Sequence, residues 1–265
     1  SMTLGFGIPA TGDARRAGEI AVRVEQLGYS TIWTNDTPAA DGLLTAAHLA
    51  DATEKIRIGI GVVAVDRRLP EEIAESVREL ELPLDRLVLG VGAGSSAAPL
   101  IIVRKAVEEL RDLLGPEPRL AVAAMGRLMC MLAGEVADTV LLNWMVPRRI
   151  EWAASQVAKG SRRSGRDDMP RLAAYVRAAI GNGATERIGR EAARYNRYPA
   201  YARHFSAMGE PFESVGVSGE KGDYPRRLAD YDRVLDEVVV RALPASDSVA
   251  STLAVAEASA PAGRA

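Results

Sequence analysis

The sequence alternates eight times between a short apolar run and a longer amphipathic stretch, and this alternation limits the folds that the chain can adopt. The runs are rich in Val, Ile, Leu and Gly, which is typical of strands buried on both faces of a parallel sheet. They cover residues 4–9, 30–35, 56–64, 86–91, 120–124, 139–143, 172–178 and 237–243. Eight strand–helix units predict an α/β fold, a (β/α)8 TIM barrel that forms a single domain over residues 1–265.

The amphipathic stretches predict the helices of this barrel. We expect them at 13–27, 42–53, 100–114, 126–133, 147–157, 185–208, 224–231 and 247–258, with a short helix after Pro70. A doubly wound open sheet is the alternative, but no G-x-G-x-x-G motif follows the first run. At the ends, residues 1–2 are interpreted as a tag scar, and residues from about 259 to 265 as a frayed tail.

Charge and composition exclude several classes of function. Thirty-three basic against 35 acidic residues give a net charge of −2, whereas nucleic-acid binding needs a basic face. No apolar run approaches the roughly 18 residues of a membrane span. The single cysteine, Cys130, is typical of the reducing cytoplasm, and two separated histidines do not predict a metal site. We therefore expect a cytoplasmic protein that acts on a small molecule.

The carboxyl ends of the predicted strands, where barrel enzymes carry their chemistry, contain few reactive side chains. No lysine stands there for a Schiff base, and Asp36 stands alone rather than in a metal-binding cluster. These positions are rich instead in glycine, alanine and small polar residues. Such a site suits a bound organic cofactor that does the chemistry while the protein supplies shape and hydrogen bonds.

Four segments carry a resemblance to a known family: GYSTIWTND at 28–36, ATEKIRIGIGV at 52–62, LDRLVLGVG at 84–92 and LAGEVAD at 132–138. In these segments and their order, the chain resembles the luciferase-like monooxygenase superfamily, and within it the class that uses coenzyme F420, a deazaflavin. The resemblance implies an oxidoreductase that transfers a hydride to or from a small organic substrate. Two alternatives stay open: an FMN-dependent monooxygenase of the same fold, and a non-catalytic barrel that binds a flavin.

The resemblance also implies roles for residues near the second and third strands. Family members carry a non-prolyl cis peptide in a bulge that closes the third strand and supports the cofactor ring, which places this bond at Gly61–Val62. The alternative for Gly61 is a simple tight strand end. Asp36 corresponds to an acidic residue that hydrogen-bonds the cofactor, and its alternative is a helix N-cap in the next loop.

A turn after the fifth strand is expected to hold the cofactor phosphate. In the family a glycine-containing turn does so through its amides, and this maps to Ala124, Met125 and Gly126. Free N–H groups at a helix N-terminus attract an anion. The sequence 181–183, Gly-Asn-Gly before the next long helix, is the competing anion site.

The fourth and sixth strands supply the remaining candidates for cofactor binding. Gly92, Gly94 and Ser95 are expected to flank the cofactor, with close strand–helix packing as the alternative for the glycines. Asn143 ends the sixth strand next to Trp144, and the alternative for this pair is a buried Asn beside an interface Trp.

His204 and Asp36 are the candidates for moving a proton. His204 belongs to a stripe that recurs at three- and four-residue steps and so predicts one helical face: Tyr195, Tyr198, Tyr201, His204 and Phe205. Most such stripes are core, which is the alternative here. The segments after the third and fourth strands are short, where larger relatives insert a lid, and the family suggests a homodimer.

Overall fold

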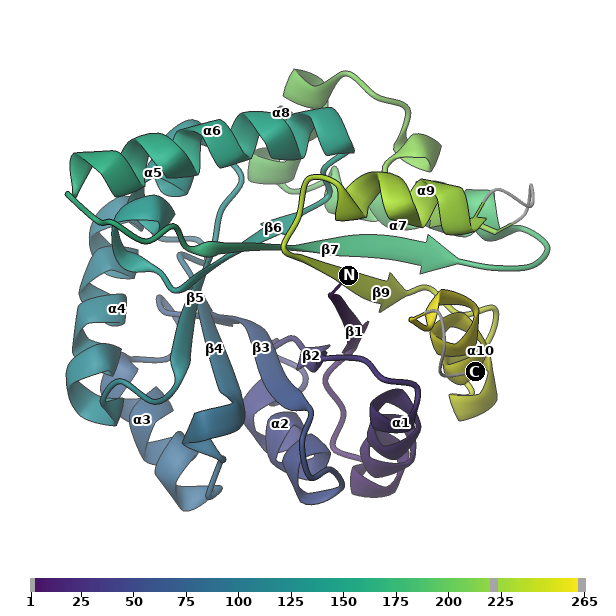
Figure 1. Cartoon of the computed structure of the whole chain (residues 1–265), viewed down its shortest axis with the longest axis horizontal. Coiled ribbons are helices and arrows are strands. Elements are labelled where there is room, and N and C mark those ends of the chain that lie inside the picture. Colours follow the sequence, from purple (N-terminus) through teal and green to yellow (C-terminus); the bar gives the residue numbers. More distant parts are fainter. Residues whose placement is uncertain (1–2, 220–223, 262–265) are drawn as a thin grey trace.

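The computed structural model describes residues 3–219 and 224–261 and shows a closed parallel barrel (Figure 1). Within these residues the strands are β1 Leu4–Ile8, β2 Thr31–Thr34, β3 Arg57–Ala64, β4 Leu87–Gly92, β5 Arg119–Ala123, β6 Thr139–Asn143, β7 Arg171–Ala179, β8 Val217–Ser218 and β9 Glu237–Ala242. Strands β1 to β7 pair in sequence, and β9 pairs with both β7 and β1. The barrel therefore closes, and the predicted (β/α)8 fold is confirmed.

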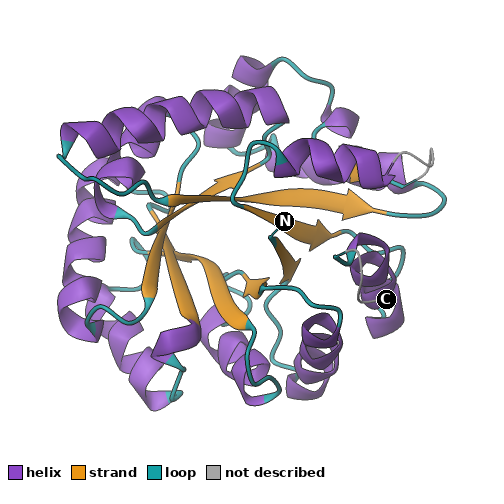
Figure 2. Ribbon diagram, in the orientation of Figure 1, coloured by secondary structure: helices purple, strands orange, loops and turns teal. Residues whose placement is uncertain are grey.

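Helices surround the barrel on the outside (Figure 2). In the described residues they are α1 Ala14–Gln26, α2 Gly42–Asp51, α3 Pro70–Glu79, α4 Pro99–Leu114, α5 Arg127–Val136, α6 Pro147–Arg163, α7 Ala184–Tyr195, α8 Pro199–Met208, α9 Tyr224–Asp232 and α10 Val249–Ser259. Their starts follow from the sequence, because Asp13 caps α1 and proline opens α3, α4, α6 and α8. Among these helices, none is long and apolar enough to cross a membrane.

The barrel interior is filled around Trp33. Its indole Nε1 donates to Glu237 Oε1 at 2.8 Å, and its ring lies edge-on to Tyr175 with centroids 6.2 Å apart. A Cβ on Gly59 would come within 2.3 Å of this indole, and one on Gly5 within 3.2 Å. The glycines on the neighbouring strands thus make room for the largest side chain in the barrel centre.

The predicted helix 185–208 is corrected by the structure to two helices. α7 ends at Tyr195 and α8 begins at Pro199, because proline fits the first turn of a helix but not its interior. The predicted stripe therefore does not share one helical face. Tyr195 instead meets Tyr201 across the break, with ring centroids 4.9 Å apart, and Tyr198 stays 61% exposed.

The predicted frayed tail is also wrong at its first residue. Ser259 is buried at the end of α10, where its hydroxyl donates to the Val255 carbonyl at 2.8 Å and lies 2.5 Å from the Tyr224 hydroxyl. Residues 262–265, like the predicted tag scar at 1–2, lie outside the described residues.

The connections that follow the strands differ greatly in length. Residues 65–69 join β3 to α3 and residues 93–98 join β4 to α4, so the prediction of short segments there is confirmed. Between β7 and β9, by contrast, residues 180–236 include α7, α8 and α9 and the two-residue strand β8 beside β7. The extra structure at the carboxyl end of the barrel comes from this segment.

Candidate functional site

The end of β3 has the predicted bulge. The peptide bond between Gly61 and Val62 is cis, and the register of β3 against β4 shifts at this point. The Val62 side chain lies against β4, since a Cβ on Gly90 or on Gly92 would come within 2.9 or 2.8 Å of it. Gly92 therefore makes room for Val62, which differs from the strand–helix packing considered above.

The bulge is held from the opposite wall of the barrel. The Tyr175 hydroxyl, on β7, donates to the Gly61 carbonyl at 3.0 Å. Burial raises the pKa of Tyr175, so the phenol stays protonated and keeps donating at neutral pH. The backbone at Gly61–Val62 thus has a fixed place at the carboxyl end of the barrel.

Gly94 and Ser95 contact the side chain of Asp66, in the connection after β3. The Ser95 N–H donates to Asp66 Oδ2 at 2.7 Å, and a Cβ on Gly94, which has φ +59°, would overlap the same carboxylate. Gly94 is therefore required both by its backbone conformation and by the approach of Asp66. Ser95 is predicted to flank the cofactor, but its amide already donates to the carboxylate of Asp66, a residue that sequence analysis did not identify.

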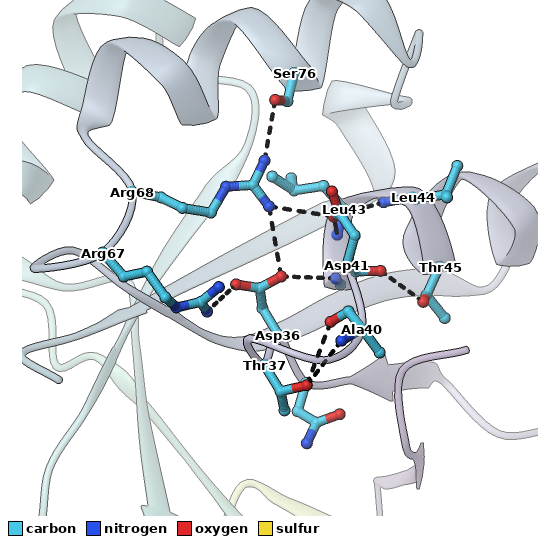
Figure 3. A network of polar contacts seen from close by, with 12 residues as sticks. Asp36, Thr37, Ala40, Asp41, Leu43, Leu44, Thr45, Arg67, Arg68 and Ser76 are labelled. Atoms are coloured by element: carbon cyan, nitrogen blue, oxygen red, sulfur yellow. Dashed lines mark hydrogen bonds and ion pairs between the residues drawn. The ribbon is translucent and has the colours of Figure 1, made fainter. Parts of the chain in front are cut away.

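Asp36 lies at the centre of a polar network between β2 and the connection after β3 (Figure 3). Its side chain is fully buried, and Oδ1 accepts the Gly42 N–H at 2.7 Å while Oδ2 accepts Arg67. Arg68 Nη1 lies 3.4 Å from Oδ1. Both oxygens are therefore engaged within the chain. The N-cap of α2 is Asp41, which accepts from Leu43 and Leu44, and Asp36 adds a contact to the first residue of that helix.

Arg68 extends this network to α2 and α3. It donates to Asp41 Oδ1 at 3.2 Å and to Ser76 Oγ at 3.1 Å. Although partial burial opposes it, the Leu44 N–H and the charge of Arg68 hold the pKa of Asp41 below its ordinary value. Sequence analysis missed Arg67 and Arg68, and their only signal is an Arg-Arg pair directly after the third strand.

Asn143 links β6 to β7 and α8. Its Oδ1 accepts Arg177 Nη1 at 2.5 Å, and its Nδ2 donates to the Tyr201 hydroxyl at 3.0 Å. The Arg177 guanidinium stacks over Trp144, 4.4 Å from the ring centroid. Since the Tyr201 oxygen already accepts from Asn143, its own O–H is left to donate elsewhere.

His204 holds α8 against the end of β6. Its Nε2 lies 2.7 Å from the Trp144 carbonyl, which can only accept, so this nitrogen carries the proton. Burial lowers the pKa of His204, and its Nδ1 is buried with no partner in the structure. The imidazole is therefore neutral at pH 7 and joins Trp144, Tyr195 and Phe205 in one aromatic cluster.

The turn before α5 is open to an anion. Gly126 is the N-cap of α5 and makes no side-chain cap hydrogen bond, and a Cβ on it would contact no atom within 4 Å. Ala124 is less available, since its N–H donates to the Leu141 carbonyl. At the competing turn 181–183, Arg187 already donates to the Asn182 carbonyl at 2.8 Å.

The carboxyl end of the barrel therefore fits a phosphate-bearing aromatic cofactor in part. Gly126 offers an uncapped helix N-terminus, Asn143 and Tyr201 offer polar groups, and the Gly61–Val62 backbone is held between the barrel walls. In the described residues, no three His, Cys, Asp or Glu side chains lie close enough together to bind a metal ion.

The fold and the sequence are similar to one family of enzymes. The family model described as luciferase-like monooxygenase matches residues 2–101. The 5,10-methylenetetrahydromethanopterin reductase of Methanolobus tindarius is 27% identical over 220 residues, which cover 70% of this chain and 68% of the reductase. The matched part of the chain is thus similar to luciferase-like monooxygenases, the resemblance that its motifs predicted.

Two solved structures show how far this fold agreement extends. An F420-dependent secondary alcohol dehydrogenase, in complex with an F420-acetone adduct, has a TM-score of 0.80 and 16% identity, with 96% of this chain and 97% of that chain covered. The oxygenating constituent of 3,6-diketocamphane monooxygenase, from Pseudomonas putida and in complex with FMN, has a TM-score of 0.73 and 13% identity, with 97% and 96% covered. The barrel fold is therefore shared with these enzymes over almost the whole chain.

Proposed function

We propose that this protein is an oxidoreductase that uses coenzyme F420 to transfer a hydride to or from a small organic substrate. The observation that carries the proposal is the 27% identity over 220 residues with a methylenetetrahydromethanopterin reductase. The match of fold to an F420-dependent alcohol dehydrogenase supports the same cofactor. The scarcity of reactive side chains at the carboxyl end of the barrel agrees with chemistry that belongs to a cofactor.

The residues of this chain would hold the cofactor by shape and hydrogen bonds. The backbone of Gly61–Val62 would support its ring, the amides after Gly126 its phosphate, and Asn143 a polar edge. When bound, F420 supplies a hydride donor or acceptor. Tyr201, whose O–H is left to donate, is better placed than Asp36 to give a proton to the substrate, because both oxygens of Asp36 are engaged.

FMN is the second candidate, favoured by the FMN-bound monooxygenase of the same fold. Titration of the protein with F420 and with FMN, followed by fluorescence, separates the two. We expect the lower Kd for F420. Tighter binding of FMN, together with hydrogen peroxide formed from the reduced flavin and dioxygen, would overturn the deazaflavin proposal in favour of a monooxygenase.

The phosphate position is tested at Gly126. Gly126→Asp places a carboxylate at the N-cap of α5, where it caps the helix and repels a phosphate, so cofactor affinity should fall at least about tenfold while the fold keeps its stability. Gly126→Asn is the matched control, because Asn caps without charge. Riboflavin, which lacks the phosphate of FMN, should bind both variants alike, and equal losses for riboflavin and FMN would contradict the assignment.

A homodimer and a cytoplasmic location complete the proposal. Two exposed leucines lie on the elements that follow β2 and β3, Leu44 on α2 and Leu69 before α3, at 37% and 58% exposure. They support association through this side, which sedimentation of the wild type and of a Leu69→Ser variant would check. The single cysteine, Cys130, is free and buried, which agrees with a reducing compartment.

A further inference from the structure

Two arginines lie side by side inside the carboxyl end of the barrel. Arg177 on β7 and Arg241 on β9 are register partners. Side chains alternate along a strand, so both point to the same side as Tyr175 and Val239, which belong to the interior cluster. The pair therefore lies one layer above the packed centre of the barrel.

Neither arginine forms an ion pair with a carboxylate of the described residues. Arg177 is 4% exposed and donates to the neutral amide oxygen of Asn143, while Arg241 lies 3.5 Å from the Gly7 carbonyl. Burial and the charge of Arg177 lower the pKa of Arg241 to about 10. Two guanidinium groups thus share this layer with no carboxylate of the described residues in contact, and the nearby charge of Glu191 only partly offsets their repulsion, an arrangement that opposes folding.

Two donors in this layer have no acceptor. Arg177 Nε and Trp144 Nε1 are buried and lack a hydrogen-bond partner in the structure. Both side chains are more than nine-tenths buried, so water does not readily replace the missing acceptors. Trp144 also has φ +54°, a left-handed conformation that is unfavourable for a bulky residue and that brings its indole under the Arg177 guanidinium. The layer is rich in donors and positive charge and poor in acceptors.

We propose that Arg177 and Arg241 bind an oxyanion, a carboxylate or a phosphate, of a small molecule that enters the carboxyl end of the barrel. A guanidinium presents its N–H groups in a planar fork that matches the paired oxygens of such an anion. The anion supplies the missing acceptors and cancels the charge that the two side chains share. Arg241 keeps a minor part of its surface exposed, so the layer borders solvent on the side of β9. The proposal does not depend on the redox function, because an anion can bind the cofactor-free chain.

The test is calorimetric titration of the cofactor-free full chain with inorganic phosphate and with acetate, at an ionic strength held constant with sodium chloride. We expect saturable binding of at least one anion, weakened at least tenfold in Arg177→Gln and in Arg241→Gln. Arg104→Gln is the control, since Arg104 pairs with Glu135 on the outside of the barrel. Absent binding to the wild type, or equal affinity in all four proteins, would overturn the proposal.

A second variant separates binding from stability. Arg177→Met keeps an unbranched stem and removes the charged guanidinium, so in chloride alone its unfolding midpoint should equal or exceed that of the wild type. A midpoint lower by more than a few degrees would show that Arg177 serves the fold and would count against the proposal.

The same variants identify the source of the anion. If they lose affinity for FMN but not for riboflavin, the bound oxyanion is the cofactor phosphate, and the assignment of that phosphate to the amides after Gly126 is replaced. If the ratio of the two affinities is unchanged while free phosphate or acetate is lost, the oxyanion belongs to the substrate. Either result supports the arginine site.

Discussion

Asp36 ties the residues after β2 to the residues after β3, because its two oxygens accept from Gly42, Arg67 and Arg68. Asp36→Asn removes the charge that both arginines contact. We expect a loss of about 2–3 kcal/mol in the free energy of unfolding, measured in urea at pH 7. The matched control is Asp41→Asn, since Asp41 is 46% exposed and Asn caps a helix as well as Asp does. Equal losses of stability in the two variants would contradict a special role of Asp36 in joining these two connections.

Glu237 sets a second single-residue prediction, at the amino end of the barrel. Burial raises the pKa of Glu237 above its ordinary value of 4.5, although Trp33 and Arg171 partly oppose the shift. The folded chain therefore binds more protons than the unfolded chain above pH 4.5, and stability falls as the pH rises through the folded pKa. Glu237→Gln should be more stable than the wild type at pH 8 and equally stable below pH 4.5. Chemical unfolding across this range checks the prediction, and parallel curves for the two proteins would refute it.

At the scale of elements, α5 and α6 touch through their backbones. A Cβ on Gly160 would lie 1.8 Å from the Met131 carbonyl, and one on Gly134 would lie 2.1 Å from the Val157 carbonyl. Gly160→Ala must push the two helices apart, and we expect a loss of about 2 kcal/mol or more. Gly18→Ala in α1 is the control, because its Cβ meets Ala52 at an ordinary 3.4 Å and should stabilise the helix by about 0.5–1 kcal/mol. Thermal unfolding by circular dichroism measures both, and a stabilised Gly160→Ala would contradict the close packing.

The strands and helices of the barrel were largely predictable from the sequence. Each barrel strand was visible because it is an apolar run bounded by turns, and Asp13 marked the start of α1. The strand β8 was not, since two residues at Val217–Ser218 form no pattern. At the candidate site, the bulge at Gly61–Val62 followed from the resemblance. The partners of Asp36 did not follow, because Arg67 contacts it across 31 residues of sequence and no local spacing encodes that contact.

For the whole molecule, the docking of α8 on the barrel depends on a neutral histidine. Burial lowers the pKa of His204 below its ordinary 6.5, so below that pH the unfolded chain binds more protons and the folded state loses stability. We expect the free energy of unfolding to fall by up to about 1.4 kcal/mol per pH unit between pH 6.5 and the lower folded pKa. His204→Gln should flatten this part of the curve, because the glutamine side chain does not titrate in this range. Unfolding in urea at pH 5 to 8 measures the slopes, and a steep slope that persists in His204→Gln would contradict the assignment.

Trp33 and its glycine neighbours have one more consequence. The indole and Tyr175 fill the middle of the barrel, so among the described residues they separate its carboxyl end from its amino end. A molecule that binds at the carboxyl end of the barrel therefore enters and leaves through that end. When two molecules bind one behind the other at that end, the inner one must bind first and leave last. The packing of the barrel then sets the order in which the two molecules bind.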